Sequence, residues 1–414
     1  MTSQGEVWEP RPPELLPPWH TPAREELQLQ ARRVAMEEVL PVANELDPQK
    51  GVIPAVLLDR LAELGWFGIT VPAEHGGLGL GVFEYCMVSE ELARAWMSTA
   101  SILARSQGLG TAVPDADRRE ELNRRSARGE WIGGIALSEP DAGSDLAGVS
   151  TRAVLEGDEW VVTGHKRWCG NAEAADFIQV LVREREPEPG ESRSRGLVNL
   201  LLEKERGSFP EGLTGHPIDK VGYHGFLTWD LTFDGVRIPR DNVIDEAAAS
   251  DEEGAATRRA GFAQAQLFLN TARVHTAARA VGLARAALED SILYLQEREQ
   301  FGHPIGDFQA LRFAVAEMAA QIEQARAFYR QVAHLLDLGV PCEEEAAMVK
   351  LEATEMSVRV TNQAMQLHGG NGYTTERQVE RHWRDARLTT IFEGTSEIQK
   401  RIISDRLLPR SPLG

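Results

Sequence analysis

The spacing of apolar residues changes twice along this chain of 414 residues, and these changes constrain the fold more than any other feature. Residues 24–130 carry apolar side chains at intervals of three and four, as at Leu27 and Ala31, which is typical of amphipathic helices. Short β-type runs divided by turn residues follow over 131–243. Helical spacing then returns, in longer segments, over 261–414. We therefore predict an α+β protein, mostly α, in which a central antiparallel β-barrel-like domain separates an N-terminal helical domain from a C-terminal helical bundle.

Two segments fall outside these three domains. Residues 1–23 are rich in proline and of mixed charge, so we predict an extended N-terminal arm. Residues 244–260 are small and acidic and show no apolar period, so we predict a linker.

Charge and composition exclude several classes of function. The formal net charge of −19 repels nucleic acid and anionic membrane surfaces. No apolar run approaches the roughly 18–20 residues that a membrane span needs, so we expect neither a nucleic-acid nor a membrane partner. The three cysteines, Cys86, Cys169 and Cys342, form neither a disulfide framework nor a zinc spacing. We therefore expect no metal site and a reducing cytoplasmic location.

An acidic residue followed by glycine stands out near the C-terminus. Glu393 precedes Gly394, and Ser396 with Gln399 matches an S-x-x-Q capping box, so Glu393 is predicted to lie in the loop that enters the last helix. One interpretation is a carboxylate that stabilises the helix N-terminus by about 0.3–1 kcal/mol. The other is a general base held over a ligand. Position alone does not choose between them.

Three segments elsewhere in the chain bear on this choice. They read "LSEPDAGSDLAGVSTRA" (137–153), "REQFGHPIGDFQALRF" (298–313) and "HGGNGYTTERQVERHWRDARLTTIFEGTSEIQ" (368–399). Together and in this order they resemble the acyl-CoA dehydrogenase family. The resemblance implies FAD-dependent α,β-dehydrogenation of an acyl thioester, from acyl-CoA to trans-2-enoyl-CoA. It implies that Glu393 removes the proton from C2 while a hydride leaves C3 for flavin N5.

The resemblance also assigns residues to the cofactor and to the substrate. The residues that match FAD-binding positions are Leu137, Ser138, Ser144, Trp168, Gly170, Arg298, Phe301, Gln309, Gln366, Gly369, Gly370, Thr395 and Glu397. Those that match substrate-binding positions are Ser144, Arg273 and Gly394. Because the matches from Arg298 to Gly370 are positions at which one FAD is shared between chains, the resemblance implies a homodimer or homotetramer. It also implies an electron-transferring flavoprotein as the electron acceptor.

Two positions refine these expectations. Some family members carry the base directly before the arginine that Arg273 matches, but Ala272 stands there in this chain. The family usually reads W-I-T or W-I-S where this chain has Trp168–Cys169–Gly170, and the loss of that hydroxyl near flavin N5 costs about 1–3 kcal/mol unless another donor replaces it. We further expect burial against the acyl chain and the flavin to raise the pKa of Glu393 towards neutrality.

Three other functions stay open at this stage. An acyl-CoA oxidase would use the same residues and pass its electrons to oxygen. An acyl-carrier-protein-linked dehydrogenase would take its thioester from a phosphopantetheine arm instead of CoA. A catalytically silent member of the fold would keep the architecture without the reaction. The apolar pattern indicates neither the length nor the branching of the acyl group.

Overall fold

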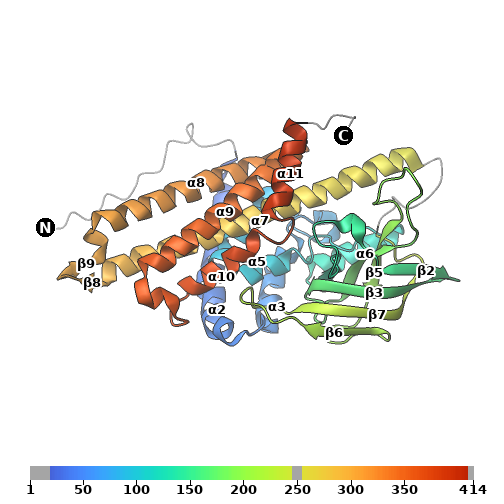
Figure 1. Ribbon diagram of the computed structural model, residues 1–414, viewed down its shortest axis with the longest axis horizontal. Coiled ribbons are helices and arrows are strands. Elements are labelled where there is room, and N and C mark those ends of the chain that lie inside the picture. The colour runs from blue at the N-terminus through green and yellow to red at the C-terminus, as the bar shows by residue number, and fades with distance from the viewer. Residues whose placement is uncertain (1–18, 245–253, 409–414) are drawn as a thin grey trace.

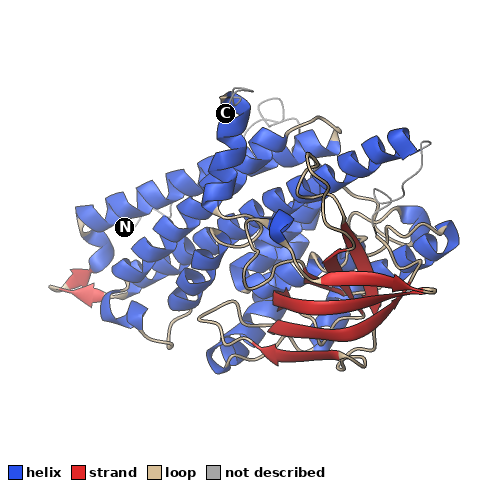
Figure 2. Ribbon diagram, turned by 45° about the vertical axis from the view of Figure 1, so that its right-hand side comes forward, coloured by secondary structure: helices blue, strands red, loops and turns tan. Residues whose placement is uncertain are grey.

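The protein has the predicted order of a helical domain, a curled sheet and a long helical bundle. The computed structural model describes residues 19–244 and 254–408, with only the backbone for 254–268 (Figure 1). Most of the predicted arm, residues 1–23, therefore lies outside the described residues, and the first helix begins at Pro22. Figure 2 shows the curled sheet at one end of the molecule, the long helices extending away from it, and a short β-hairpin at the opposite end. This confirms the predicted fold class.

The helices before the sheet pack around their own apolar cluster, which includes Trp66, Phe67 and Trp96. A π-helical turn, Ala35–Val39, joins the first two into one continuous rod. Their bounds are α1 Pro22–Val34, α2 Leu40–Leu46, α3 Ala55–Glu63, α4 Val82–Ala95, α5 Met97–Leu103 and α6 Ala116–Ala127.

The sheet is antiparallel except along one edge of a single strand. The strands are β1 Gly133–Ala136, β2 Arg152–Glu156, β3 Glu159–Gly170, β4 Phe177–Arg183, β5 Leu197–Glu203, β6 Leu213–Pro217 and β7 Thr228–Pro239. Antiparallel pairs join β2 to β3, β3 to β7, β7 to β6 and β4 to β5.

The prediction of a wholly antiparallel domain is wrong where β1 and β2 meet β4. Both pair with β4 in parallel, β1 along residues 177–180 and β2 at Arg183. The two strands thus follow one another along the same edge of β4, and residues 137–151 leave the sheet between them. We call this segment the 137–151 loop.

The C-terminal bundle consists of long helices that cross the N-terminal domain. They are α7 Gly254–Glu297, α8 Gln309–Asp337, α9 Glu343–Leu367, α10 Val379–Thr389 and α11 Ser396–Leu407, with a short hairpin of β8 Glu299–Gln300 and β9 His303–Pro304 between α7 and α8. Helix α7 begins inside the predicted linker 244–260, so that prediction is wrong from Gly254 onwards. The alanine-rich sequence there favours helix without an apolar period.

Helices α4 and α7 approach each other closely at a glycine. A Cβ on Gly282 would lie 2.3 Å from the backbone oxygen of Glu90 and 3.0 Å from the Cβ of Ala93. Only glycine therefore permits this crossing, which joins the N-terminal domain to the bundle.

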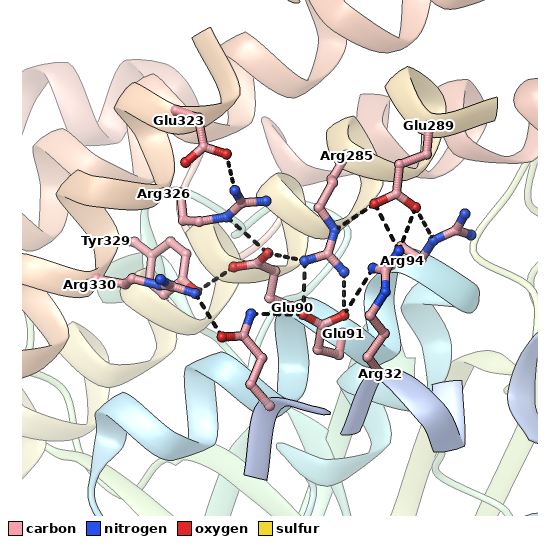
Figure 3. A network of polar contacts seen from close by, with 11 residues as sticks. Arg32, Glu90, Glu91, Arg94, Arg285, Glu289, Glu323, Arg326, Tyr329 and Arg330 are labelled. Carbon is pink, nitrogen blue, oxygen red and sulfur yellow. Dashed lines mark hydrogen bonds and ion pairs between the residues drawn. The ribbon is translucent and has the colours of Figure 1, made fainter. Parts of the chain in front are cut away.

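Buried charges lie beside this crossing (Figure 3). The side chain of Glu90 on α4 has no exposed surface. It accepts hydrogen bonds from Arg285 Nη1 on α7 at 2.6 Å, from Arg326 Nε on α8 at 3.1 Å, and from the hydroxyl of Tyr329. Burial alone would raise the pKa of Glu90, but the charges of Arg326, Arg285 and Arg330 outweigh it and lower the pKa to about 2. Glu90 is therefore ionised, and its carboxylate links α4 to α7 and α8.

We predict that Glu90→Gln destabilises the fold by about 3–5 kcal/mol, because it leaves the guanidinium groups of Arg285 and Arg326 without this carboxylate. Urea unfolding at fixed protein concentration measures the change in free energy. Because the folded pKa of about 2 lies below the ordinary 4.5, the stabilisation is complete above about pH 4.5 and is lost as the pH falls towards 2.

Glu323→Gln is the matched control, because Glu323 also pairs with Arg326 but is 66% exposed. It should change the free energy of unfolding by less than about 1 kcal/mol. Equal effects of the two substitutions would contradict the assigned role of Glu90.

Candidate active site

The loop between α10 and α11, residues 390–395, has an unusual backbone at the residue of interest. Glu393 has a φ of +53°, which side-chain-bearing residues rarely adopt, and Gly394 follows with a φ of +88°. Two donors hold the carbonyl oxygen of Gly394, namely Lys350 Nζ at 2.7 Å and Gln399 Nε2 at 3.1 Å. A Cβ on Gly394 would lie 2.5 Å from Gln399 Nε2, so the turn requires glycine. The Glu393 loop is therefore strained locally and fixed by its surroundings.

The N-cap of α11 is one residue earlier than the capping-box prediction placed it. Thr395 Oγ1 accepts the backbone N–H of Ile398 at 3.3 Å. The hydroxyl of Ser396 instead donates to Glu355 at 2.6 Å, and Gln399 bonds the Gly394 carbonyl. Since adjacent hydroxyl residues both suit an N-cap, the sequence pattern did not distinguish them.

The carboxylate of Glu393 is directed at α7. Its Oε1 accepts from Arg279 Nη2 at 2.8 Å, and its Oε2 accepts from the hydroxyl of Thr276. The side chain of Glu393 is 29% exposed, whereas that of Arg279 is 1% exposed. Since Thr395 caps α11 and Glu393 bonds α7, these contacts do not fit the interpretation of Glu393 as a helix-stabilising acid.

The pKa of Glu393 is lowered among the protein's own groups, whereas the expected rise referred to burial against an acyl chain and a flavin. Burial alone would raise it, but the charge of Arg279, hydrogen bonds from Thr276 and Arg279, and the charge of Arg105 together lower it. With the protein's own groups around it, Glu393 is therefore ionised at neutral pH.

The arginine that bonds Glu393 is Arg279. The resemblance singles out a different arginine of α7, Arg273, as a substrate contact. Arg273 donates to Asn270 Oδ1 at 2.8 Å, a neighbour on its own helix. Arg279 and Thr276, which make the contacts with Glu393, were not predicted. Their spacing of three residues places them on one face of α7. An arginine inside the apolar run "AARAVGLA" is a signal that could have indicated a buried ion pair.

The 137–151 loop is anchored by a buried acid. Glu139 accepts hydrogen bonds from Lys166 Nζ at 2.9 Å and from the backbone N–H groups of Ser150 and Thr151 at 2.9 and 2.8 Å. Burial alone would raise the pKa of Glu139, but these bonds lower it to about 2. Lys166 also donates to the Leu137 carbonyl at 3.0 Å. The anchor fixes the backbone at the start of the loop, where Leu137 and Ser138 lie half-buried, while Ser144 is exposed further along it.

A tryptophan stands exposed beside the start of this loop. Trp168 has a φ of +66° and is 56% exposed, at a point where the pairing of β3 with β7 shifts register. The backbone N–H of the preceding residue, Arg167, donates to the Ser138 carbonyl at 2.8 Å. The guanidinium of Arg167 lies 4.9 Å from the centroid of the Trp168 ring. The exposed part of the indole, next to fixed backbone groups, fits a flat aromatic ring such as that of a flavin.

A further set of predicted cofactor residues lies on and beside the β8–β9 hairpin, at the other end of the bundle (Figure 1). Phe301, at the tip of the β8–β9 hairpin, is 90% exposed, and Arg298 and Gln309 beside it are also exposed. A second segment with exposed residues follows α9 and packs on the last turns of α7 through Tyr294. The hydroxyl of Tyr294 accepts Asn371 Nδ2 at 2.8 Å, and the Tyr294 ring stacks on His368 at 4.4 Å. The residues here that the resemblance assigns to FAD are Gly369 and Gly370 in this segment and Gln366 in the last turn of α9.

The structure thus sorts the predicted residues into two groups. The residues close to Glu393 in sequence, Gly394, Thr395 and Glu397, lie in its loop or in the first turn of α11.

In residues 19–244 and 254–408, no helix is long and apolar enough to span a membrane. In the same ranges, no cluster of three His, Cys, Asp or Glu side chains could hold a metal ion.

Comparison with known proteins identifies three consecutive domains. Residues 21–125, 134–236 and 259–408 match the N-terminal, middle and C-terminal domains of acyl-CoA dehydrogenase. The chain is 37% identical to (2S)-methylsuccinyl-CoA dehydrogenase of Cereibacter sphaeroides, over 93% of this chain and 70% of the relative. It is 36% identical to the short-chain specific acyl-CoA dehydrogenase of Bos taurus, over 92% and 89%. The structure of butyryl-CoA dehydrogenase from Megasphaera elsdenii superposes with a TM-score of 0.82 and 30% identity, over 94% of this chain and 99% of the other.

We predict that Arg279→Gln moves the pKa of Glu393 above its ordinary value of 4.5. The substitution removes the charge that lowers the pKa, while burial, which raises it, is kept. Infrared difference spectra between each protein and its Glu393→Gln counterpart isolate the stretching band of the protonated Glu393 carboxyl. That band should be absent from the parent near pH 5 and present in the Arg279→Gln protein. Equal titration of Glu393 in both would show that Arg279 does not control its charge.

Proposed function

Because the chain belongs to the acyl-CoA dehydrogenase family, whose members are flavin-dependent oxidoreductases, we propose that it converts an acyl-CoA to the trans-2-enoyl-CoA with Glu393 as the catalytic base. The observation that carries this proposal is the geometry of Glu393. A partly exposed carboxylate is held in a left-handed backbone turn and oriented from α7 by Arg279 and Thr276.

Glu393 takes the proton from C2 of the acyl group. Because its pKa is lowered, the carboxylate is ionised and able to accept a proton at neutral pH. Some of the charge of Arg279 must be withdrawn from Glu393 for the transfer to be favourable, because an ion-paired carboxylate is a weaker base than a free one.

The C2 proton becomes acidic only when the thioester carbonyl oxygen is stabilised. The backbone N–H of Glu393 has no acceptor among the residues that the structure describes. We propose that it donates to this oxygen, which can contribute about 3 kcal/mol to the transition state. The left-handed turn supports this role, since one residue then presents both its carboxylate and its N–H. Ser144, Arg273 and Gly394 are the other contacts that we propose for the thioester and its carrier.

FAD is the flavin that we propose, and when bound it supplies the acceptor for the hydride from C3. Two groups of residues would hold it. One chain provides Leu137, Ser138, Ser144, Trp168, Gly170, Thr395 and Glu397. Its partner provides Arg298, Phe301, Gln309, Gln366, Gly369 and Gly370 from the distant end of the bundle. Arginine suits the diphosphate, because its fork bonds phosphate through two N–H groups. A homodimer or homotetramer follows from this division, and an electron-transferring flavoprotein is the proposed acceptor of the electrons.

We predict that Glu393→Gln slows anaerobic bleaching of the flavin by acyl-CoA by about 10²–10⁴-fold, the usual contribution of a general base. Stopped-flow absorbance measures the rate. Glu323→Gln makes the same chemical change at an exposed site and should bleach at the parent rate. If the Glu393→Gln protein keeps the parent rate, another group removes the proton.

We predict that Arg298→Gln weakens FAD binding by about 10- to 100-fold, the loss expected for a charged hydrogen bond. Recovery of flavin fluorescence on dilution measures the release of FAD, and light scattering measures the mass of the assembly. Arg237→Gln, at an arginine 55% exposed on β7, is the matched control. Unchanged FAD affinity in the Arg298→Gln protein would contradict the shared cofactor site.

A further inference from the structure

The buried arginine that bonds Glu393 also reaches a second helix. Besides its bond to Glu393, Arg279 donates from Nη1 to Ser101 Oγ on α5 at 2.7 Å and from Nη2 to Thr276 Oγ1 at 2.9 Å. Its Nε is buried and has no hydrogen-bond partner. Arg279 thus has an unused donor while it bonds the carboxylate of Glu393.

A second arginine, Arg105, enters the same region from the segment after α5. Its Nε is also buried without a partner, and its guanidinium makes no hydrogen bond or ion pair with any described residue. It is close enough for its charge to lower the pKa of Glu393. The ring centroid of Phe226 lies 5.9 Å from Arg105 Cζ.

Gly170 leaves room for this arginine. A Cβ on Gly170 would lie 3.0 Å from Arg105 Nη2 and 3.2 Å from Phe226 Cε2. The position where the family usually has a serine or threonine is therefore bordered in this chain by a guanidinium group. Gly170, which departs from the family pattern, is therefore the residue that leaves space for the unpaired side chain of Arg105.

The other titratable groups that the charges of Arg279 or Arg105 affect do not balance the two positive charges. Tyr85 and Tyr223 are buried and neutral, since burial raises the pKa of each. His275 is neutral as well, because burial and then the charge of Arg279 hold its pKa well below the usual range. Lys350 bonds the Gly394 carbonyl, and burial lowers its pKa to about 8. Two guanidinium groups therefore face a single carboxylate.

A buried guanidinium N–H without an acceptor is costly, and the planar fork of arginine fits a carboxylate best. An anion that meets both arginines would have to arrive together with the thioester. Because Arg279 bonds the carboxylate that has to reach C2, an anion that also reaches Arg279 lies only a few bonds from C2. This geometry fits a short acyl group that ends in a carboxylate.

We propose that Arg279 and Arg105 select a short dicarboxylic acyl thioester, whose free carboxylate binds between them and takes Arg279 away from Glu393. This proposal rests on the proposed function and specifies its substrate class. Arg279 then acts as a specificity residue that also controls the base. A substrate without the second carboxylate leaves Glu393 paired, whereas a dicarboxylic one frees it to take the C2 proton.

The test compares ligands that differ only in this charge. The FAD-loaded protein is titrated anaerobically with succinyl-CoA and glutaryl-CoA, with the methyl ester of each, and with butyryl-CoA. Flavin absorbance reports both the dissociation constant and the bleaching rate. We expect each acid to bind about 10- to 100-fold more tightly than its ester, and to bleach the flavin faster. Arg279→Gln and Arg105→Gln should each reduce this preference at least about 10-fold, while the exposed control Arg237→Gln keeps it.

Each other outcome overturns a defined part of the account. If butyryl-CoA or the esters bleach the flavin as well as the acids do, the dicarboxylate proposal is wrong and the proposed function stands. The same holds if neither arginine substitution changes the preference. If no thioester perturbs or bleaches the flavin, both proposals fail. If Arg279→Gln does not fold, Arg105→Gln and the ligand pairs on the parent protein still decide.

Discussion

The ion pair between Arg279 and Glu393 is the contact on which the candidate site depends. Through it, α7 orients the carboxylate of a loop that lies 114 residues further along the chain. Through Ser101 the same guanidinium bonds α5, so one buried side chain connects both helical domains at the site. Because its side chain is 1% exposed, removal of its anion would leave a buried charge, which costs about 3–5 kcal/mol. The close crossing of α4 and α7 at Gly282 is a second place where α7 contacts the N-terminal domain.

Three residues assigned to the cofactor or to the reaction have a left-handed backbone. Glu393, Trp168 and Phe301 all have φ between +50° and +70°, although none of them is glycine. Such conformations cost on the order of 1–3 kcal/mol each and persist only where the surroundings impose them. At Glu393 the surroundings are Lys350 and Gln399, which hold the next carbonyl. At Trp168 they are the irregular pairing of β3 and the bond from Arg167 to Ser138. The same conformation also occurs at Lys50, Gln107, Asn171 and Tyr223, to which no role is assigned, so the strain agrees with the assigned roles but does not establish them.

The sequence predicted what depends on local spacing and missed what depends on distant partners. The order of helices, sheet and helices followed from apolar periodicity, because burial of one face is a local property. The parallel pairing of β1 with β4 did not, because it joins segments that are separated by the whole 137–151 loop and by two further strands. Glu393 was identified from its motif, but its ion-pair partner Arg279 was not predicted. No local pattern shows which of two arginines on one helix faces the loop. The sequence likewise did not show the ion pair that lowers the pKa of Glu393 among the protein's own groups. The rise expected on burial against the acyl chain and the flavin stays a prediction.

The central claim is that Glu393 itself takes the C2 proton, and hydrogen exchange at C2 tests it most directly. An acyl-CoA analogue that carries no transferable hydrogen at C3 is incubated with the protein in D₂O, and mass spectrometry follows deuterium at C2. We predict exchange by the parent protein and exchange at least about 100-fold slower in the Glu393→Gln variant. Equal exchange by the two proteins would contradict the assignment of the base and the account built on it.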